Sequence, residues 1–404
     1  METKTTEICI VGAGVSGLIA AKTLEQGGYT PVIIEQSKTI GGRVQTDIED
    51  TIFFDRGFQV LLTAYPQAKK HLDYKALQLQ YFKPGALIFS QGKRQRIGDP
   101  LRDISALWPT VWATVGTFRD KLKIFTLSRQ LKKKTIASIF LEPEMTTAAY
   151  LNRYGFSDTI IAHFFKPFFT GIFLEEELRT SSRMFEFVFK MFAEGSAAIP
   201  KAGIGAIPDQ LKSGLRKTQF HMGKKVAEVN DKELVFQDGT AITAEHIITT
   251  SPLDVSAIAW KSCDNLYFEV QEQQFPTGII GLIAAKEALT NNLHYLFDAQ
   301  TGGKKVLSVT VVKEHGLDGE TLAQKVSDEL MSFCEISTVQ LLKHYRIQRA
   351  LPDIKDLKMN RSVSEYSSKQ GLYTAGDYLL NSSLNAAMRS GEATAEALFT
   401  TIKG

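Results

Sequence analysis

The stretch EICIVGAGVSGLIAAKTLEQGGYTPVIIEQ, residues 7–36, decides the fold class of this chain. Residues 7–11 are apolar and partly β-branched, which indicates a parallel strand buried on both faces. Residues 15–26 have a helical composition, and residues 31–35 have the pattern of a second strand. The order strand, glycine turn, helix, strand predicts an α/β fold with a Rossmann-like nucleotide-binding unit.

The turn in this unit has the pattern G-x-G-x-x-G. The first glycine permits a tight turn, the second lets the backbone approach a pyrophosphate, and the third lets helix and strand pack closely. The amino terminus of the following helix favours negative charge. We therefore expect the pyrophosphate to be held by Gly12, Ala13, Gly14, Ser16 and Gly17.

Glu35 ends the second predicted strand, where its carboxylate is placed to accept hydrogen bonds from a ribose, with Gln36 beside it. A carboxylate at this position also disfavours a 2′-phosphate, which argues against NADP. The unit alone does not distinguish NAD from FAD.

A second glycine cluster follows at residues 41–46, GGRVQT, and residues 54–59 read FDRGFQ. Taken alone, these segments are an ordinary turn with a solvated arginine. Near the carboxyl terminus, residues 371–398 read GLYTAGDYLLNSSLNAAMRSGEATAEAL, a strand, an A-G-D turn, a linker and a helix start.

Together these motifs resemble the flavin-containing amine oxidase superfamily, and their pattern is closest to its protoporphyrinogen oxidase and carotenoid desaturase branches. The resemblance implies one FAD, because FAD extends well beyond the first nucleotide unit. It places Arg43 near the pyrophosphate. It also places Gly42, Gly57, Phe58 and Gln59 along the ribityl chain and the flavin.

The resemblance also assigns roles to the carboxyl-terminal motif. Gly376 forms the turn, and Asp377 would bind a hydroxyl of the ribityl chain. Ala386, Ala387 and Met388 would present backbone N–H groups to the flavin pyrimidine, where the helix dipole favours negative charge. The family usually has glycine where this chain has Ala386. Residues 224–252 resemble the family's middle FAD segment, with Val226 on the adenine side.

The resemblance therefore implies a discontinuous FAD-binding domain and a second, α+β substrate-binding domain. The FAD-binding domain would comprise residues 1–84, 195–265 and 366–404. The substrate-binding domain would comprise residues 85–194 and 266–365. FAD should be non-covalent, since no cysteine or histidine follows His344. No second G-x-G-x-x-G follows a strand, so we expect no nicotinamide site.

The predicted substrate domain contains a phenylalanine-rich stretch between residues 164 and 192. Such a stretch either lines a large apolar pocket or packs a helical core. Within and after it, four elements resemble the protoporphyrinogen oxidase and carotenoid desaturase branches: Pro167, Gly171 to Phe173, Leu178 to Ser182, and Pro200 to Pro208.

Residues 104–115 place Trp108 and Trp112 on one apolar helical face, with basic residues downstream. This pattern favours helices packed on the substrate domain with a solvated basic edge. Peripheral membrane contact that draws an apolar substrate from a bilayer is the alternative.

Length and composition exclude several classes of protein. A chain of 404 residues exceeds one ordinary domain. A net charge of +3 gives no reason to expect a nucleic acid partner. The 3 cysteines lack metal-ligand spacing, so no metal site is expected, and they fit a reducing cytosol. No signal peptide or spanning segment is visible, so we expect a cytoplasmic protein, with membrane association left open. The oligomeric state is not indicated.

We expect an FAD-dependent oxidoreductase in which the flavin N5 accepts a hydride from a C–H bond of a bulky, largely apolar substrate. Carotenoid-like desaturation and porphyrinogen oxidation both fit. One alternative is an amine oxidase acting on a C–N bond, for which Lys286 and Lys304 match the family's active-site lysine only in rough position. Another is a flavin-binding protein with a structural or redox-neutral role. No catalytic residue is assigned.

Overall fold

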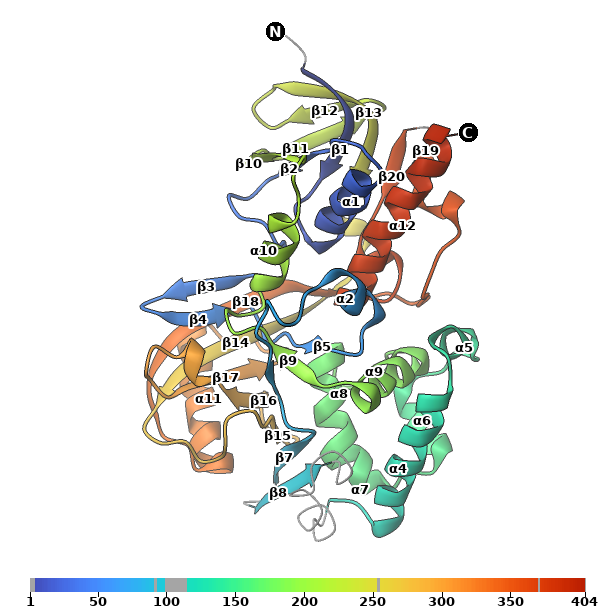
Figure 1. Cartoon of the computed structure of the whole chain (residues 1–404). Coiled ribbons are helices and arrows are strands. Elements are labelled where there is room, and N and C mark those ends of the chain that lie inside the picture. Colours follow the sequence, from blue (N-terminus) through green and yellow to red (C-terminus); the bar gives the residue numbers. More distant parts are fainter. Residues whose placement is uncertain (1–3, 91–92, 99–114, 253–254, 370, 404) are drawn as a thin grey trace.

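The computed structural model describes residues 4–90, 93–98, 115–252, 255–369 and 371–403. An eight-stranded sheet and a seven-stranded sheet dominate this part of the chain. Figure 1 shows the eight-stranded sheet close to both termini and the seven-stranded sheet below it. Trp108 and Trp112, which carry the predicted amphipathic stripe, lie outside the described residues.

The eight-stranded sheet gathers strands from distant parts of the chain. Its strand order is β10-β2-β1-β13-β12-β11, and β20 pairs with both β13 and β19. Strand β1 runs parallel to both β2 and β13, and β13 runs parallel to β20. The strands are β1 (Lys4–Val11), β2 (Val32–Glu35), β10 (Gln219–Met222), β11 (Val226–Asn230), β12 (Glu233–Phe236), β13 (Ala241–Thr249), β19 (Ser367–Lys369) and β20 (Leu372–Thr374). This parallel core confirms the predicted α/β class.

Helices α1 (Val15–Gln26) and α12 (Leu384–Lys403) pack against each other beside this sheet (Figure 1). A methyl group on Gly391 of α12 would lie 2.2 Å from the backbone oxygen of Ser16. The two helices can therefore come this close only where α12 carries a glycine. Helices α2 (Pro66–His71) and α10 (Ala206–Ser213) lie nearby.

The seven-stranded sheet has the order β18-β14-β17-β16-β15-β7-β8. Its strands are β7 (Gly85–Ser90), β8 (Lys93–Gly98), β14 (Trp260–Val270), β15 (Gly281–Ile283), β16 (Thr290–Tyr295), β17 (Val306–Val311) and β18 (Thr338–Pro352). Leu266, Leu293 and Leu307 share a buried cluster with Leu330 of α11 (Gly319–Cys334), which covers one face of the sheet. The domain boundary expected after residue 265 falls inside β14, and the division into two domains remains a proposal.

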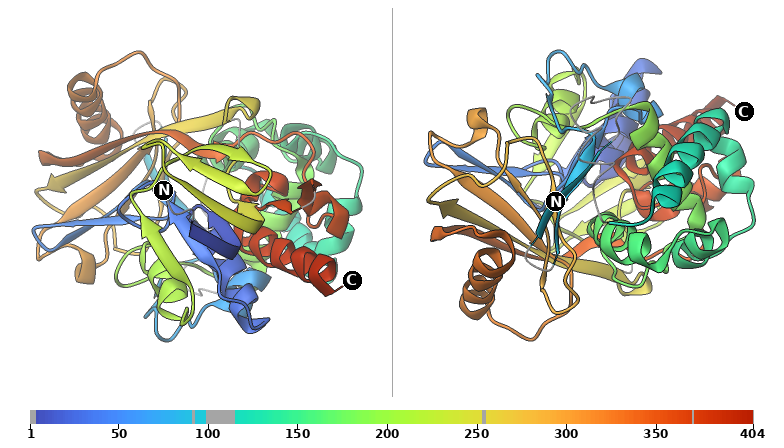
Figure 2. Two further views of the ribbon diagram at one scale, coloured as in Figure 1. Left: turned by 90° about the horizontal axis from the view of Figure 1, so that it is seen from above. Right: turned by 90° about the horizontal axis from the view of Figure 1, so that it is seen from below.

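A helical layer lies on the other side of this sheet from α11 (Figures 1 and 2). Its elements are α4 (Phe118–Lys133), α5 (Ile136–Leu141), α6 (Thr147–Tyr154), α7 (Asp158–Ile160), the π-helical turn η2 (Ile161–Phe165), α8 (Lys166–Phe173) and α9 (Ser182–Glu194). Most of the phenylalanine-rich stretch lies in this layer. Phe165, Phe169, Phe185 and Phe187 are fully buried and belong to the main core, so they pack helices rather than line an open pocket.

Small elements connect these layers. Strands β3 (Thr46–Glu49) and β4 (Ile52–Asp55) form a hairpin. A short sheet contains β5 (Leu61–Leu62), β6 (Gln80–Tyr81) and β9 (Ala197–Ile199). The 3-10 turns are η3 (Val255–Ala257), η4 (Asp298–Gln300), η5 (Val363–Tyr366) and η6 (Asp377–Leu379).

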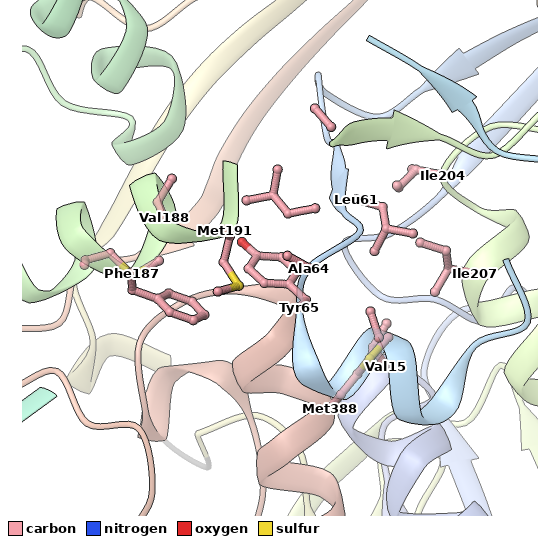
Figure 3. Close-up of a cluster of buried hydrophobic side chains, with 14 of the residues drawn as sticks. Val15, Leu61, Ala64, Tyr65, Phe187, Val188, Met191, Ile204, Ile207 and Met388 are labelled. Atoms are coloured by element: carbon pink, nitrogen blue, oxygen red, sulfur yellow. The ribbon is translucent and has the colours of Figure 1, made fainter. Parts of the chain in front are cut away.

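One buried cluster joins the nucleotide-binding unit to the helical layer. Val15 of α1 and Met388 of α12 belong to the same cluster as Phe187 of α9 (Figure 3). Tyr65 stacks on Phe187 with their ring centroids 5.7 Å apart. The start of α12 is therefore fixed to both layers by apolar packing.

No helix among the described residues is long and apolar enough to cross a bilayer.

Candidate functional site

The two glycine turns predicted from the sequence face each other in the structure. Residues Gly14 and Gly41 form an isolated parallel bridge, and the Gly41 amide donates to the Ala13 carbonyl at 2.9 Å. A methyl group on Gly42, which has φ +61°, would lie 3.3 Å from the Gly14 Cα. The second cluster therefore brings backbone, without side chains, against the first. Gly12 begins the first turn, and Gly17 lies in the first turn of α1.

Glu35 ties the first turn to the end of β2. Its carboxylate is 8% exposed and accepts hydrogen bonds from the Ala13 amide at 2.7 Å and the Ser37 amide at 2.8 Å. The Lys224 amide donates to the Glu35 carbonyl at 2.9 Å, which brings the segment leading to Val226 beside the same strand end. Gln36 is exposed next to it, Val226 is half-buried, and Ser16 is buried in α1.

Arg43 and Asp377 form an ion pair at 2.5 Å although they are far apart in the sequence. The Arg43 side chain is 40% exposed, whereas that of Asp377 is 7% exposed. Arg43 also donates to the Ala350 carbonyl at 3.1 Å, and its guanidinium carbon lies 5.5 Å from the centre of the Trp260 ring. The A-G-D turn, with Gly376 before the aspartate, thus meets the second glycine cluster through a charged pair.

The loop from Gly57 to Gln59 connects this region to the seven-stranded sheet. The Gln59 amide group donates to the Arg43 carbonyl at 2.8 Å. The Phe58 ring stacks on His294 of β16 with centroids 4.1 Å apart. The loop therefore links the glycine turns to β16 of the seven-stranded sheet.

The start of α12 contains the three residues whose amides were predicted to face the flavin pyrimidine, Ala386, Ala387 and Met388. The Ala386 amide donates to the Ser383 hydroxyl at 3.0 Å, and the Ala387 amide donates to the Ser383 carbonyl at 2.8 Å. Met388 lies beyond the first turn, where the amide bonds within the helix, and its side chain is buried in the core. These three amides are engaged. The first-turn amides that helix geometry leaves without an intrahelical partner belong to Leu384 and Asn385.

Two buried titratable groups lie near these turns, and the sequence motifs pointed to only one of them, Asp55. His294 is 4% exposed, and burial lowers its pKa to about 3, so its imidazole is neutral. Burial raises the pKa of Asp55 to about 6, while its carboxylate accepts hydrogen bonds from the Thr46 hydroxyl at 2.6 Å and the Ile204 amide at 2.9 Å. A single histidine in a strand gives no sequence signal that its side chain will be buried beside the site. Only the motif position of Asp55 singled it out.

The two lysines considered for an amine oxidase lie at the surface. Lys304 is 40% exposed and forms an ion pair with Glu269 at 2.9 Å. Lys286 is exposed, and its carbonyl accepts a hydrogen bond from Lys313. Neither lysine is buried.

Comparisons with known proteins agree with this geometry. Residues 15–399 match the family described as flavin containing amine oxidoreductase. Over 170 residues the chain is 25% identical to protoporphyrinogen oxidase 2 of Arabidopsis thaliana, which covers 41% of this chain and 32% of that protein. Over 88 residues it is 35% identical to 15-cis-phytoene desaturase of Synechococcus elongatus, covering 21% and 18%. These matches span about a third or less of the relatives' lengths.

The fold is also shared with a solved fatty acid isomerase from P. acnes, which produces CLA. The two structures superimpose with a TM-score of 0.71 at 14% identity, covering 98% of this chain and 99% of the isomerase. At this identity the likeness concerns the fold alone. The family match extends over most of the chain, so the protein belongs to the family described as flavin containing amine oxidoreductase.

Proposed function

We propose that FAD lies along the backbone of the two facing glycine turns. The pyrophosphate would lie at Gly12 to Gly17 and Gly42, beside the Arg43 guanidinium. The observation that carries this proposal is the approach of Gly42 to Gly14, where a methyl group would reach 3.3 Å from the facing Cα. Bare backbone on both sides leaves N–H groups free to face an anion.

The adenosine end would follow β2. The Glu35 carboxylate has its two backbone partners at Ala13 and Ser37, and each oxygen keeps a second lone pair for a ribose hydroxyl. The adenine would then point toward Val226, beyond the Glu35 to Lys224 contact. The negative charge of Glu35 would disfavour a 2′-phosphate.

The flavin end would run past Gly57, Phe58 and Gln59 toward α12. Asp377 is held by Arg43 through one oxygen, which leaves the other oxygen to accept from a ribityl hydroxyl. The amides of Leu384 and Asn385 would face the pyrimidine ring. The positive end of the helix dipole there favours negative charge on a bound ring.

When bound, FAD supplies the acceptor for a hydride taken from a substrate C–H bond. The chain would position the substrate, exclude water and hold the dipole of α12 at the ring. We propose a bulky, largely apolar substrate, treated in the manner of a carotenoid desaturase or a protoporphyrinogen oxidase. The names of the two matched relatives support this choice.

Two alternatives have specific support. The family description itself favours an amine oxidase acting on a C–N bond, although both candidate lysines are exposed. A redox-neutral reaction is the other alternative, and a fatty acid isomerase is one protein with this fold. Both alternatives use the same FAD site and differ in what happens to the flavin.

Anaerobic mixing of the FAD-loaded protein with candidate porphyrinogens, carotenoids and amines separates these readings. Loss of the flavin absorbance near the visible maximum with a carotenoid or porphyrinogen supports the proposed dehydrogenation. Loss with amines alone supports the amine oxidase. Persistent oxidised flavin together with an isomerised product contradicts both and supports the redox-neutral role.

A further inference from the structure

A cavity of about 550 Å³ lies between the helical layer, the end of β18 and the turn before α12. We call it the helix–sheet cavity. Its apolar walls come from Met145, Ile172, Phe173, Met184, Leu351 and Leu357. The volume is within the range of small-molecule sites, about 300–1,000 Å³.

The cavity adjoins the proposed FAD site at the end of β18 and the turn before α12. Pro352 and Ser382 both line it, and the Ser382 hydroxyl donates to the Pro352 carbonyl at 2.8 Å. Ala350, two residues before Pro352, accepts the hydrogen bond from Arg43. Ser382 also directly precedes Ser383, which caps α12. A molecule in this cavity would therefore lie next to the proposed flavin end.

The backbone around the cavity is strained at non-glycine residues. Leu174 and Leu178 both have φ +51°, and Ser382 has φ +50°. Left-handed backbone costs a non-glycine residue about 1–2 kcal/mol. Such residues persist where the surrounding structure fixes them, and they cluster at functional sites. Leu174 directly follows α8, and Leu178 directly precedes Arg179, which lines the cavity.

Six charged side chains line the cavity, three of each sign: Glu144, Glu175 and Asp353 are acidic, and Arg179, Lys261 and Lys355 are basic. Glu175 accepts hydrogen bonds from the amides of Glu177 and Thr180 and from the Thr180 hydroxyl, so its carboxylate serves the turn. Lys261 pairs with Asp353 at 3.5 Å. Among the residues that the structure describes, Arg179, Lys355 and Glu144 line the cavity without an ion-pair partner, and all three are exposed.

We infer that the helix–sheet cavity is the substrate pocket and that it takes an amphipathic substrate with a carboxylate, held by Arg179 beside the apolar walls. This inference rests on the proposed FAD site and narrows the substrate class from largely apolar to apolar with an acidic head. An arginine suits this task because its planar guanidinium can bind a carboxylate through two hydrogen bonds. Lys355 would add attraction at the rim.

The test compares two ligands of equal chain length, decanoate and decan-1-ol, binding to the FAD-loaded protein. Calorimetry gives each affinity, and the visible flavin spectrum reports a ligand next to the ring. We expect decanoate to bind more tightly than decan-1-ol and to shift the flavin spectrum. Arg179→Gln should weaken decanoate binding about tenfold or more and leave decan-1-ol binding unchanged.

The matched control is Arg119→Gln, which removes the same charge from an exposed position on α4. It should leave both affinities unchanged. Equal affinity for the two ligands, or an Arg179→Gln variant that binds decanoate as the native protein does, would overturn the inference. FAD content is measured in every sample. A protein that retains FAD but fails this test contradicts only the inference, whereas a protein that cannot be loaded with FAD contradicts the proposed function.

Discussion

Replacing Gly42 with alanine should weaken FAD binding more than it weakens the fold. Gly42 has φ +61°, and the new methyl group would lie 3.3 Å from the Gly14 Cα, so the two turns must move apart by a few tenths of an ångström. The backbone conformation alone costs about 1–2 kcal/mol. Losing one charge-assisted hydrogen bond to the pyrophosphate costs a further 1.5–3 kcal/mol or so, which corresponds to a roughly 10- to 150-fold weaker affinity.

The matched control is Gly239→Ala. Gly239 has φ +78° in the β12–β13 hairpin, and a methyl group there would meet nothing within 4 Å. It should lower the free energy of unfolding by about the same 1–2 kcal/mol and leave FAD affinity unchanged.

The assay titrates apoprotein with FAD and follows the quenching of flavin fluorescence, while chemical denaturation gives the free energy of unfolding. Equal FAD affinity in the native protein and the Gly42→Ala variant would refute the reasoning, because it would mean that the pyrophosphate does not contact the facing glycines.

Three further predictions concern the surroundings of this site. Glu35→Ala should weaken FAD retention and lower the free energy of unfolding by about 2–4 kcal/mol, since two amides lose their acceptor. The FAD retention and stability of Glu35→Gln should lie between those of the native protein and Glu35→Ala. Unchanged retention in both variants would mean that the ribose contact is misplaced. His294 has a folded pKa of about 3, below its unfolded value, so its contribution to stability is present above pH 6.5 and lost as the pH falls toward 3. This loss amounts to about 5 kcal/mol at most; His294→Phe should flatten the acid side of a denaturation profile, and an identical profile would contradict the burial argument. Gly391→Ala should lower the melting temperature, because its methyl group would meet the Ser16 oxygen at 2.2 Å, whereas Gly316→Ala, with nothing within 4 Å, should not.

The local elements near the amino terminus could be predicted from the sequence almost residue by residue. Helix α1 begins and ends where its composition and the flanking glycines indicated, and β2 ends at Glu35. These features depend on residues that are close together in the chain: apolar runs that form strands, helix-forming segments and the glycines that flank them. The hairpin turn at Asp238 and Gly239 was predictable for the same reason.

Long-range pairings could not be predicted in this way. The Arg43 to Asp377 ion pair joins residues whose separate motifs suggested separate partners. The stacking of Phe58 on His294 joins a motif residue to a strand residue that carries no motif. Such contacts depend on how the two sheets meet, which no local pattern records.

The start of α12 shows where motif matching loses precision. The motif placed the donors at Ala386, Ala387 and Met388, but the Ser383 hydroxyl caps the helix and occupies the Ala386 amide. A serine before a helix is a common cap, so the linker sequence held the signal. It moves the proposed donors to Leu384 and Asn385.

A crystal structure of the FAD-loaded protein tests the central claim most directly. We predict that the pyrophosphate lies against the backbone of Gly14 and Gly42, with the ribose at Glu35 and the pyrimidine ring facing the amides of Leu384 and Asn385. FAD bound with its pyrophosphate away from these two glycines, or with its adenine at α12 and its flavin at Glu35, would contradict the account.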